Sequence, residues 1–200
     1  MRAVRLGVAC VLLLATAALT HAGGGTVKGT VTRTPDGAPL VDAVVMIDAP
    51  AADAHPPAAH VVVDQHDDTF VPHVAAVAVG TTVVFSNHDP RLHNVFSASP
   101  AKKFDLGMYG QGETKSVVFD KPGVVRIGCN VHPKMEAFVI VHTNPWVGVT
   151  DVRGAYSIAG VPGGSHRVRV WHDGMPDAET TVTVTEGGVQ ALDVKVGTER

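Results

Sequence analysis

Short runs rich in Val, Thr and Ile recur along the chain beyond residue 25, with Gly, Pro, Asp and Asn between them. The apolar spacing that marks an amphipathic helix is nearly absent there. Short apolar runs separated by turn residues are typical of all-β sandwiches. Residues 49–59, rich in Ala, Pro and His, and the Gly/Pro-rich residues 160–165 predict loops. We expect strands at residues 26–32, 43–47, 61–63, 81–85, 115–119, 123–129, 137–141, 167–171, 180–184 and 191–196.

Alternation within two segments predicts which side chains share a face of a strand. In residues 123–129 it places Val125, Ile127 and Cys129 on the core side and Arg126 on the other. In the earlier segment, residues 93–97, the same alternation places three residues on one face: His93, Val95 and Ser97. We therefore expect rigid backbone to hold both His93 and Cys129, which suits a site that must not rearrange.

The first 22 residues have the layout of a secretory signal peptide. Arg2 and Arg5 precede an apolar run over residues 6–19, and Thr20-His21-Ala22 follows as a small-residue cleavage pattern. The run is short for a membrane span, and no later segment approaches the length that a span needs. We expect cleavage after Ala22, no membrane span, and a mature protein in the periplasm or outside the cell.

Charge and cysteine content narrow the function. Without the signal peptide, 14 Lys and Arg residues face 19 Asp and Glu residues, a net charge of −5. No basic run suits nucleic acid or an anionic membrane surface. The mature chain keeps only Cys129, so it cannot form an internal disulfide in an oxidising compartment. A lone thiol there is a liability unless something such as a metal occupies it.

The two ends of the mature chain resemble each other in character and differ from the middle. The first end carries Gly29-Thr30-Val31 and a Pro-Leu-Val-Asp-Ala-Val-Val run from residue 39. The second carries Thr150-Asp151-Val152-Arg153-Gly154-Ala155-Tyr156 and a Val-Pro-Gly-Gly-Ser-His-Arg-Val run from residue 161. Together they resemble the carboxypeptidase regulatory-like domain, a small transthyretin-like β-sandwich. The resemblance implies that residues 23–53 and 144–200 form one discontinuous sandwich, with a second domain, residues 54–143, inserted at a loop.

The middle segment carries a constellation of soft and borderline metal ligands. Cys129, His132 and Met135 are spaced C-x2-H-x2-M, and His93 lies 36 residues upstream of Cys129. Two His, one Cys and a weakly bonded Met form the ligand set of a blue-copper centre. Thiolate and thioether suit Cu(I), whereas imidazole suits both oxidation states, so the mixture predicts one mononuclear copper ion that cycles between them.

Residues 69–143 resemble the cupredoxins of the plastocyanin/amicyanin branch, which are Greek-key β-sandwiches. The motifs are Phe70-Val71-Pro72, a Val-Gly-Thr-Thr-Val-Val-Phe-Ser-Asn run from residue 79, His93-Asn94-Val95, Phe119-Asp120-Lys121-Pro122-Gly123, and an amicyanin-like ligand spacing. By resemblance His93 is the upstream ligand, Cys129 the thiolate, His132 the partly exposed ligand, Met135 the axial one, and Asn94 the tie between ligand loops. The resemblance also implies redox-protein partners, with an amine dehydrogenase as donor and a c-type cytochrome as acceptor.

Plainer interpretations compete with the copper site. Cys129 alone would suit a buried core thiol, and a Cys–His catalytic pair would need an orienting third group that the sequence does not indicate. A zinc site would need a second cysteine or paired histidines, which the sequence lacks. The C-x-x-C-H motif of a c-type haem is also absent.

His88, five residues before His93, is a candidate switch or second weak ligand. Trp146 and Trp171 are expected in the core of the discontinuous sandwich.

Three function classes remain at this point. The leading hypothesis is an exported electron carrier with no enzymatic activity, since the H-x-H and H-C-H motifs of copper oxidases are absent. The second is a copper carrier or chaperone with the same ligands in a looser site. The third is a module whose discontinuous sandwich binds a partner or a glycan.

Overall fold

The computed structural model describes residues 23–50 and 60–197, and they form the predicted all-β fold. Within these residues there is no helix, and thus none with the length and apolar character to cross a bilayer. The predicted signal peptide, residues 1–22, and most of the predicted loop at 49–59 lie outside the described part of the chain.

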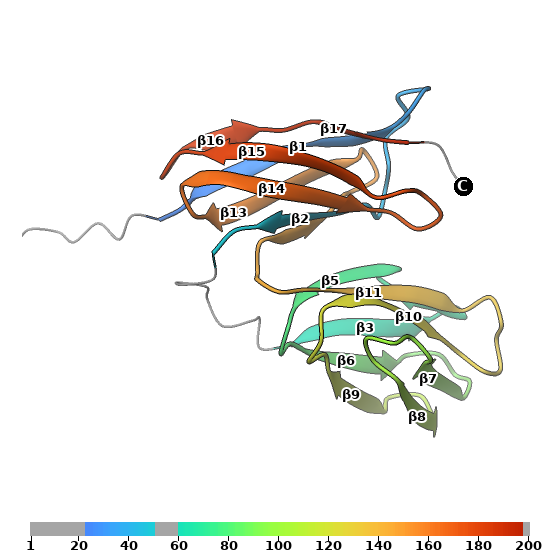
Figure 1. The fold of residues 1–200 in the computed structure, drawn as a ribbon. Helices are drawn as coiled ribbons and strands as arrows, with labels where there is room; N and C mark the ends of the chain where they lie inside the picture. The colour runs from blue at the N-terminus through green and yellow to red at the C-terminus, as the bar shows by residue number, and fades with distance from the viewer. Residues whose placement is uncertain (1–22, 51–59, 198–200) are drawn as a thin grey trace, which may run out of the picture.

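Strands from the two ends of the described chain pair with each other and form what we call the outer sandwich. Its sheets run β13-β1-β16, with β17 also pairing β1, and β12-β2-β14-β15. In Figure 1 the blue strand β1 lies beside orange and red strands from the far end of the chain. The strands are β1 (Gly25–Arg33), β2 (Val44–Asp48), β12 (Val147–Val149), β13 (Ala155–Val161), β14 (Gly164–Trp171), β15 (Ala178–Val184), β16 (Val189–Ala191) and β17 (Val194–Val196).

The middle of the chain forms the central sandwich, which carries the predicted ligands. Its sheets run β5-β11-β10-β7-β8 and β4-β3-β6-β9, and it lies below the outer sandwich in Figure 1. The strands are β3 (Val61–His66), β4 (Thr69–Val71), β5 (Val74–Ala78), β6 (Thr82–Asn87), β7 (His93–Ser97), β8 (Phe104–Tyr109), β9 (Thr114–Val118), β10 (Gly123–Gly128) and β11 (Glu136–His142).

Alternating burial in these strands builds a separate apolar core in each sandwich. In β10 the side chains of Val125 and Ile127 are buried while Arg126 is exposed, as the period of two predicts. The same alternation in β1 buries Val27 and Val31 in the core of the outer sandwich. Each core draws on both sheets of its own sandwich.

A third apolar cluster joins the two sandwiches. We call it the junction cluster; it contains Val44, Met46, Val74, Phe138 and Ile140, from β2, β5 and β11. β2 and β11 are buried on both faces, one toward their own core and one toward the junction. Two-sided burial explains why both strands read as continuous apolar runs instead of alternating ones.

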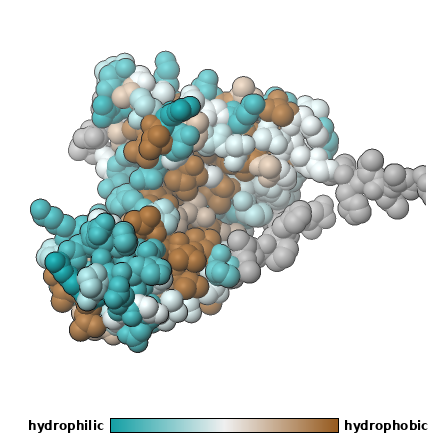
Figure 2. Space-filling model, turned by 180° about the vertical axis from the view of Figure 1, so that it is seen from behind, coloured by the Kyte–Doolittle hydropathy of each residue, from teal (hydrophilic) through white to brown (hydrophobic). Residues whose placement is uncertain are grey.

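The expectation for Trp171 is wrong because of this junction. Its ring lies 5.2 Å from that of Phe138, centroid to centroid, across the two sandwiches, and it packs against the junction cluster. Trp146 does lie in the outer core, and its indole N–H donates to the Gly160 carbonyl at 2.8 Å. On the face shown in Figure 2, hydrophobic surface gathers along and just below the line where the sandwiches meet.

Among the described residues, the end of β11 and the chain just after it are hydrogen-bonded to the end of β2 and the residue after it. The Asn144 side chain donates to the Ala49 carbonyl at 3.1 Å, and His142 Nε2 donates to the Ile47 carbonyl at 3.3 Å. That the central sandwich is a guest that folds independently of the outer one stays a prediction.

Several strands of the structure were not predicted from the sequence. β5 is Ala-rich and pairs in parallel with β11, so its partner is distant in sequence. The predicted loop at residues 160–165 shrinks to a tight hairpin connection, because Gly160 and Gly164 adopt positive φ angles of 75° and 134° that let β13 and β14 extend into it. The other strands that went unpredicted are β4, β8, β12 and β13.

Candidate metal centre

Three of the four predicted ligands meet at one end of the central sandwich. His93 opens β7, Cys129 follows directly on β10, and His132 lies in the loop before β11. His93 and Cys129 are buried, at 0% and 4% exposure, whereas the His132 side chain is 27% exposed. Val95 and Ser97 are buried with His93, in agreement with the predicted shared face.

The donor atoms of these residues form a compact triangle. The two Nδ1 atoms of His93 and His132 are 3.0 Å apart, and Cys129 Sγ lies 3.8 and 3.9 Å from them. The point equidistant from the three atoms is about 2.1 Å from each, close to the bond lengths that metals make to imidazole nitrogen and thiolate sulfur. Two imidazole nitrogens and a thiolate at this spacing fit a single transition-metal ion.

Met135 closes the ligand loop. Its side chain is 2% exposed and packs in the same apolar cluster as Cys129, and its backbone N–H donates to the His132 carbonyl at 2.8 Å. This bond makes the loop from Cys129 to Met135 a tight turn. The axial role of Met135 stays a prediction.

A side-chain bond ties the two ligand-bearing segments together. Asn94, next to His93, accepts a hydrogen bond from the Asn130 backbone N–H at 2.7 Å, and Asn130 is next to Cys129. Asn94 is 2% exposed, so solvent does not compete for this bond. The resemblance implied such a tie for Asn94, and the structure contains it.

Asp89 holds the outer nitrogen of His93. Its carboxylate is 2.8 Å from His93 Nε2, and it also accepts the backbone N–H groups of Asp67 and Asp68 at 2.8 and 3.0 Å. Burial pushes the pKa of Asp89 upward, but the hydrogen bonds from Asp68, His93 and Asp67 outweigh it and keep that pKa below its ordinary value. An ionised Asp89 fixes the proton of His93 on Nε2 and leaves Nδ1 free for a metal.

A second carboxylate faces both imidazoles. Asp68 Oδ1 lies 3.8 Å from His93 Nε2 and 3.7 Å from His132 Nε2, and Asp68 Oδ2 accepts from Arg91 at 2.6 Å. Sequence analysis missed both Asp68 and Asp89. Asp89 lies only four residues before His93, and this short spacing could have indicated their contact. The contact of Asp68 with the imidazoles depends on the position of a turn in the fold, which no local sequence pattern predicts.

His88 lies outside the donor triangle. Its Nδ1 is 2.6 Å from Asp64 Oδ1, and its side chain is 64% exposed. Asp64 also accepts the Ser86 hydroxyl at 2.6 Å, so the His88 imidazole is held on the outer face of β3 and β6. A functional role for His88 stays a prediction.

Tyr109 is the polar aromatic residue on the core side of the site. It pairs with His93 across β7 and β8 and is 2% exposed. Burial, with a smaller contribution from the nearby Cys129, raises the pKa of Tyr109 to about 12, although a bond from Gln65 opposes the shift. The phenol therefore stays neutral and serves as a packing and hydrogen-bonding group.

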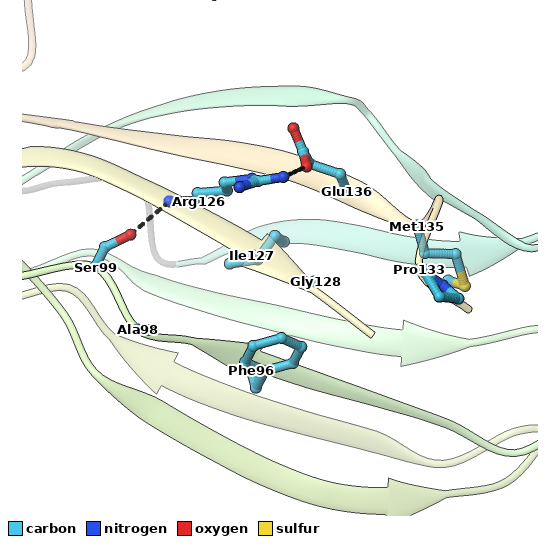
Figure 3. Close-up of a pocket in the computed structure, with 9 residues that line it drawn as sticks. All are labelled: Phe96, Ala98, Ser99, Arg126, Ile127, Gly128, Pro133, Met135 and Glu136. Atoms are coloured by element: carbon cyan, nitrogen blue, oxygen red, sulfur yellow. Dashed lines mark hydrogen bonds and ion pairs between the residues drawn. The ribbon is translucent and has the colours of Figure 1, made fainter. Parts of the chain in front are cut away.

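A hollow of about 380 Å³ lies beside the ligand loop on the outer face of β7 and β10. Figure 3 shows Phe96 on one side, the Arg126–Glu136 ion pair on the other, and the Met135 sulfur next to Pro133. A Cβ at Gly128 would come within 3.2 Å of the Phe96 ring, so glycine there lets the ring lie across the strand. Met135 therefore both lines this hollow and belongs to the apolar cluster that contains Cys129.

Comparisons with known proteins give a distant structural likeness. No protein-family model matches the chain, and no curated protein matches it. A solved structure of a reduced amicyanin mutant shares 24% identity at a TM-score of 0.40, over 49% of this chain and 98% of that one. A purple cupredoxin from Nitrosopumilus maritimus shares 24% identity at a TM-score of 0.38, over 41% of this chain and 99% of that one. A Cu(I) structure of another amicyanin mutant shares 23% identity at a TM-score of 0.40, over 49% of this chain and 98% of that one.

Proposed function

We propose that this chain is an exported electron-transfer protein that holds one copper ion with His93, Cys129, His132 and Met135. The observation that carries the proposal is the triangle of two Nδ1 atoms and one Sγ atom with sides of 3.0, 3.8 and 3.9 Å. Copper is the metal that suits two imidazoles, a thiolate and a nearby thioether. When bound, it supplies a one-electron couple between Cu(II) and Cu(I).

The chain's own contribution is to keep the donors in place. His93 and Cys129 are attached to strand ends, and the Asn94–Asn130 bond links the segments that carry them. Rigid elements hold ligands more accurately than mobile loops do. A donor set that stays in place on oxidation and reduction favours fast electron transfer over substrate chemistry, so we propose no enzymatic activity.

Electrons would enter or leave through His132. The other three proposed ligands are at most 4% exposed, whereas the His132 side chain is 27% exposed. Leu92 and Val131, each beside a proposed ligand in sequence, are 59% and 50% exposed. Exposed apolar side chains next to the proposed ligands in sequence suit brief docking of redox-protein partners.

Export follows from the signal peptide predicted at residues 1–22. In an oxidising compartment the buried free thiol of Cys129 would be protected by a bound metal. The need for this protection favours Cys129 as a metal ligand over Cys129 as a core residue without a ligand role.

Stoichiometric redox cycling tests the proposal. Residues 23–200 loaded with copper should contain one ion per chain, accept one electron, and release it again without loss of metal. If a chelator removes the copper within a single cycle, the protein is a copper carrier instead. A copper-free protein that stays folded and takes up none would contradict both functions.

A further inference from the structure

The tip of the β3–β4 hairpin lies against the metal centre. Asp67 and Asp68 form its two-residue turn with φ angles of 51° and 54°, the left-handed region that a two-residue hairpin turn requires and that Asp tolerates. Both backbone N–H groups of this turn donate to Asp89, whose carboxylate also holds His93. The turn is thereby fixed to the segment that carries a proposed ligand.

This anchoring aims the Asp68 carboxylate at the imidazoles. Arg91 Nη1 holds Oδ2 at 2.6 Å, which leaves Oδ1 facing His93 Nε2 at 3.8 Å and His132 Nε2 at 3.7 Å. Oδ1 is buried and has no hydrogen-bond partner among the described residues. These distances are too long for direct hydrogen bonds, but a carboxylate this close acts electrostatically on both rings, even though Arg91 offsets part of its charge.

We propose that Asp68 is a positioning residue whose charge sets the reduction potential of the centre by favouring the oxidised metal. The inference rests on the proposed copper site. Beside one thiolate, Cu(II) leaves the centre one unit more positive than Cu(I) does. A carboxylate facing both ligand rings from a partly buried position therefore stabilises the Cu(II) state more, and screening by salt weakens it less than an exposed charge.

The neighbouring Asp67 provides a matched control. It occupies the same turn in the same left-handed conformation, and it carries the same charge. Its side chain is 87% exposed and its carboxylate approaches His66 at 3.5 Å instead of the proposed ligands. Asp67→Asn and Asp68→Asn thus change net charge equally and differ in where the charge lies.

The test uses residues 23–200 as wild type, Asp68→Asn and Asp67→Asn, with dissociation constants for Cu(I) and Cu(II) from chelator competition. Asp68→Asn should weaken Cu(II) binding relative to Cu(I) by at least about tenfold, a rise in potential of about 59 mV for one electron. Asp67→Asn should change the ratio by less than about threefold.

Three results would overturn the inference. Equal shifts in the two variants would mean that only net charge matters. A lower unfolding midpoint of metal-free Asp68→Asn with an unchanged affinity ratio would make Asp68 purely structural. A second metal equivalent that Asp68→Asn loses would make it a ligand. A wild-type protein without a thiolate-to-copper absorption band would defeat the proposed function itself, whatever the variants do.

Discussion

Each sandwich buries a histidine, and their surroundings differ. His166 in the outer sandwich is 6% exposed, and its Nε2 donates to the Pro162 carbonyl at 2.7 Å. His93 in the central sandwich is fully buried among a second imidazole, a thiolate and two carboxylates. A buried imidazole with one backbone partner is satisfied and complete. Buried polar groups that converge on one point, beyond what each needs for its own hydrogen bonds, indicate a site.

The buried polar residues follow the same division. In the central sandwich, buried Asp89 bonds His93 and buried Asn94 bonds the residue next to Cys129. In the outer sandwich, Thr150 donates to the Leu40 carbonyl and accepts from the Ala43 N–H. The comparison therefore places the candidate metal chemistry in the central sandwich.

Truncation gives the largest expected effect. A chain of residues 23–143 lacks every strand that pairs with β1 and β2, so it should be insoluble. Residues 60–143 keep the central core and all four proposed ligands, so they should fold and bind one copper ion. Soluble yield and copper content of both chains measure this. Equal behaviour of the two would show that the sandwiches are not separate units.

Phe138→Ala tests the junction. Phe138 is 5% exposed and contacts Trp171 and His73 through ring packing, so its removal should lower the unfolding free energy by about 3–5 kcal/mol. Copper binding should persist, because Phe138 points away from the central core. Urea unfolding with an absorption spectrum of the folded state checks both parts. Loss of the copper site in this variant would mean that the junction shapes the metal centre.

Asp89→Asn should weaken metal binding by about 10–100-fold, because partners of metal-bound imidazoles contribute on that scale. Asp64→Asn is the matched control, since Asp64 bonds Ser86 and His88 and contacts no proposed ligand. Competition with a chelator gives both affinities. If the two variants bind copper equally, Asp89 does not orient His93.

A pH effect at His142 is the smallest expected. Burial lowers the pKa of His142, with Asp48 and the Ile47 carbonyl opposing the shift and Arg169 adding to it. Below the unfolded pKa of about 6.5 the unfolded state therefore binds more protons than the folded state. The free energy of unfolding then decreases as the pH is lowered, by at most about 1.4 kcal/mol per pH unit. The fall ends below the folded pKa.

His142→Gln should flatten this slope in urea unfolding between pH 7 and 5, whereas replacing the exposed His66 by Gln should not. An unchanged slope in His142→Gln would place the titrating group elsewhere.

Sequence pattern revealed the donors better than their surroundings. The period of two correctly placed Cys129 at the end of a strand on the core side, and His93 on the face of Val95 and Ser97. Such alternation is local and survives in any fold that uses the strand. Asp68 reaches the site only because a left-handed turn meets a loop some 20 residues away, and that is a tertiary contact. Trp171 was misplaced for a related reason, since its packing partner Phe138 lies on β11 in the other sandwich, whereas β14 itself alternates like a strand with one exposed face.

The absorption and EPR spectra of the copper-loaded protein, residues 23–200, test the central claim most directly, with Cys129→Ser as the control. Wild-type Cu(II) protein should show intense visible thiolate-to-copper charge transfer and the narrow copper hyperfine splitting of a thiolate-bound ion. Cys129→Ser should lose the colour and keep the fold. A pale wild-type spectrum of a nitrogen- and oxygen-ligated Cu(II), identical in Cys129→Ser, would contradict the assignment of the donor triangle as a copper–thiolate centre.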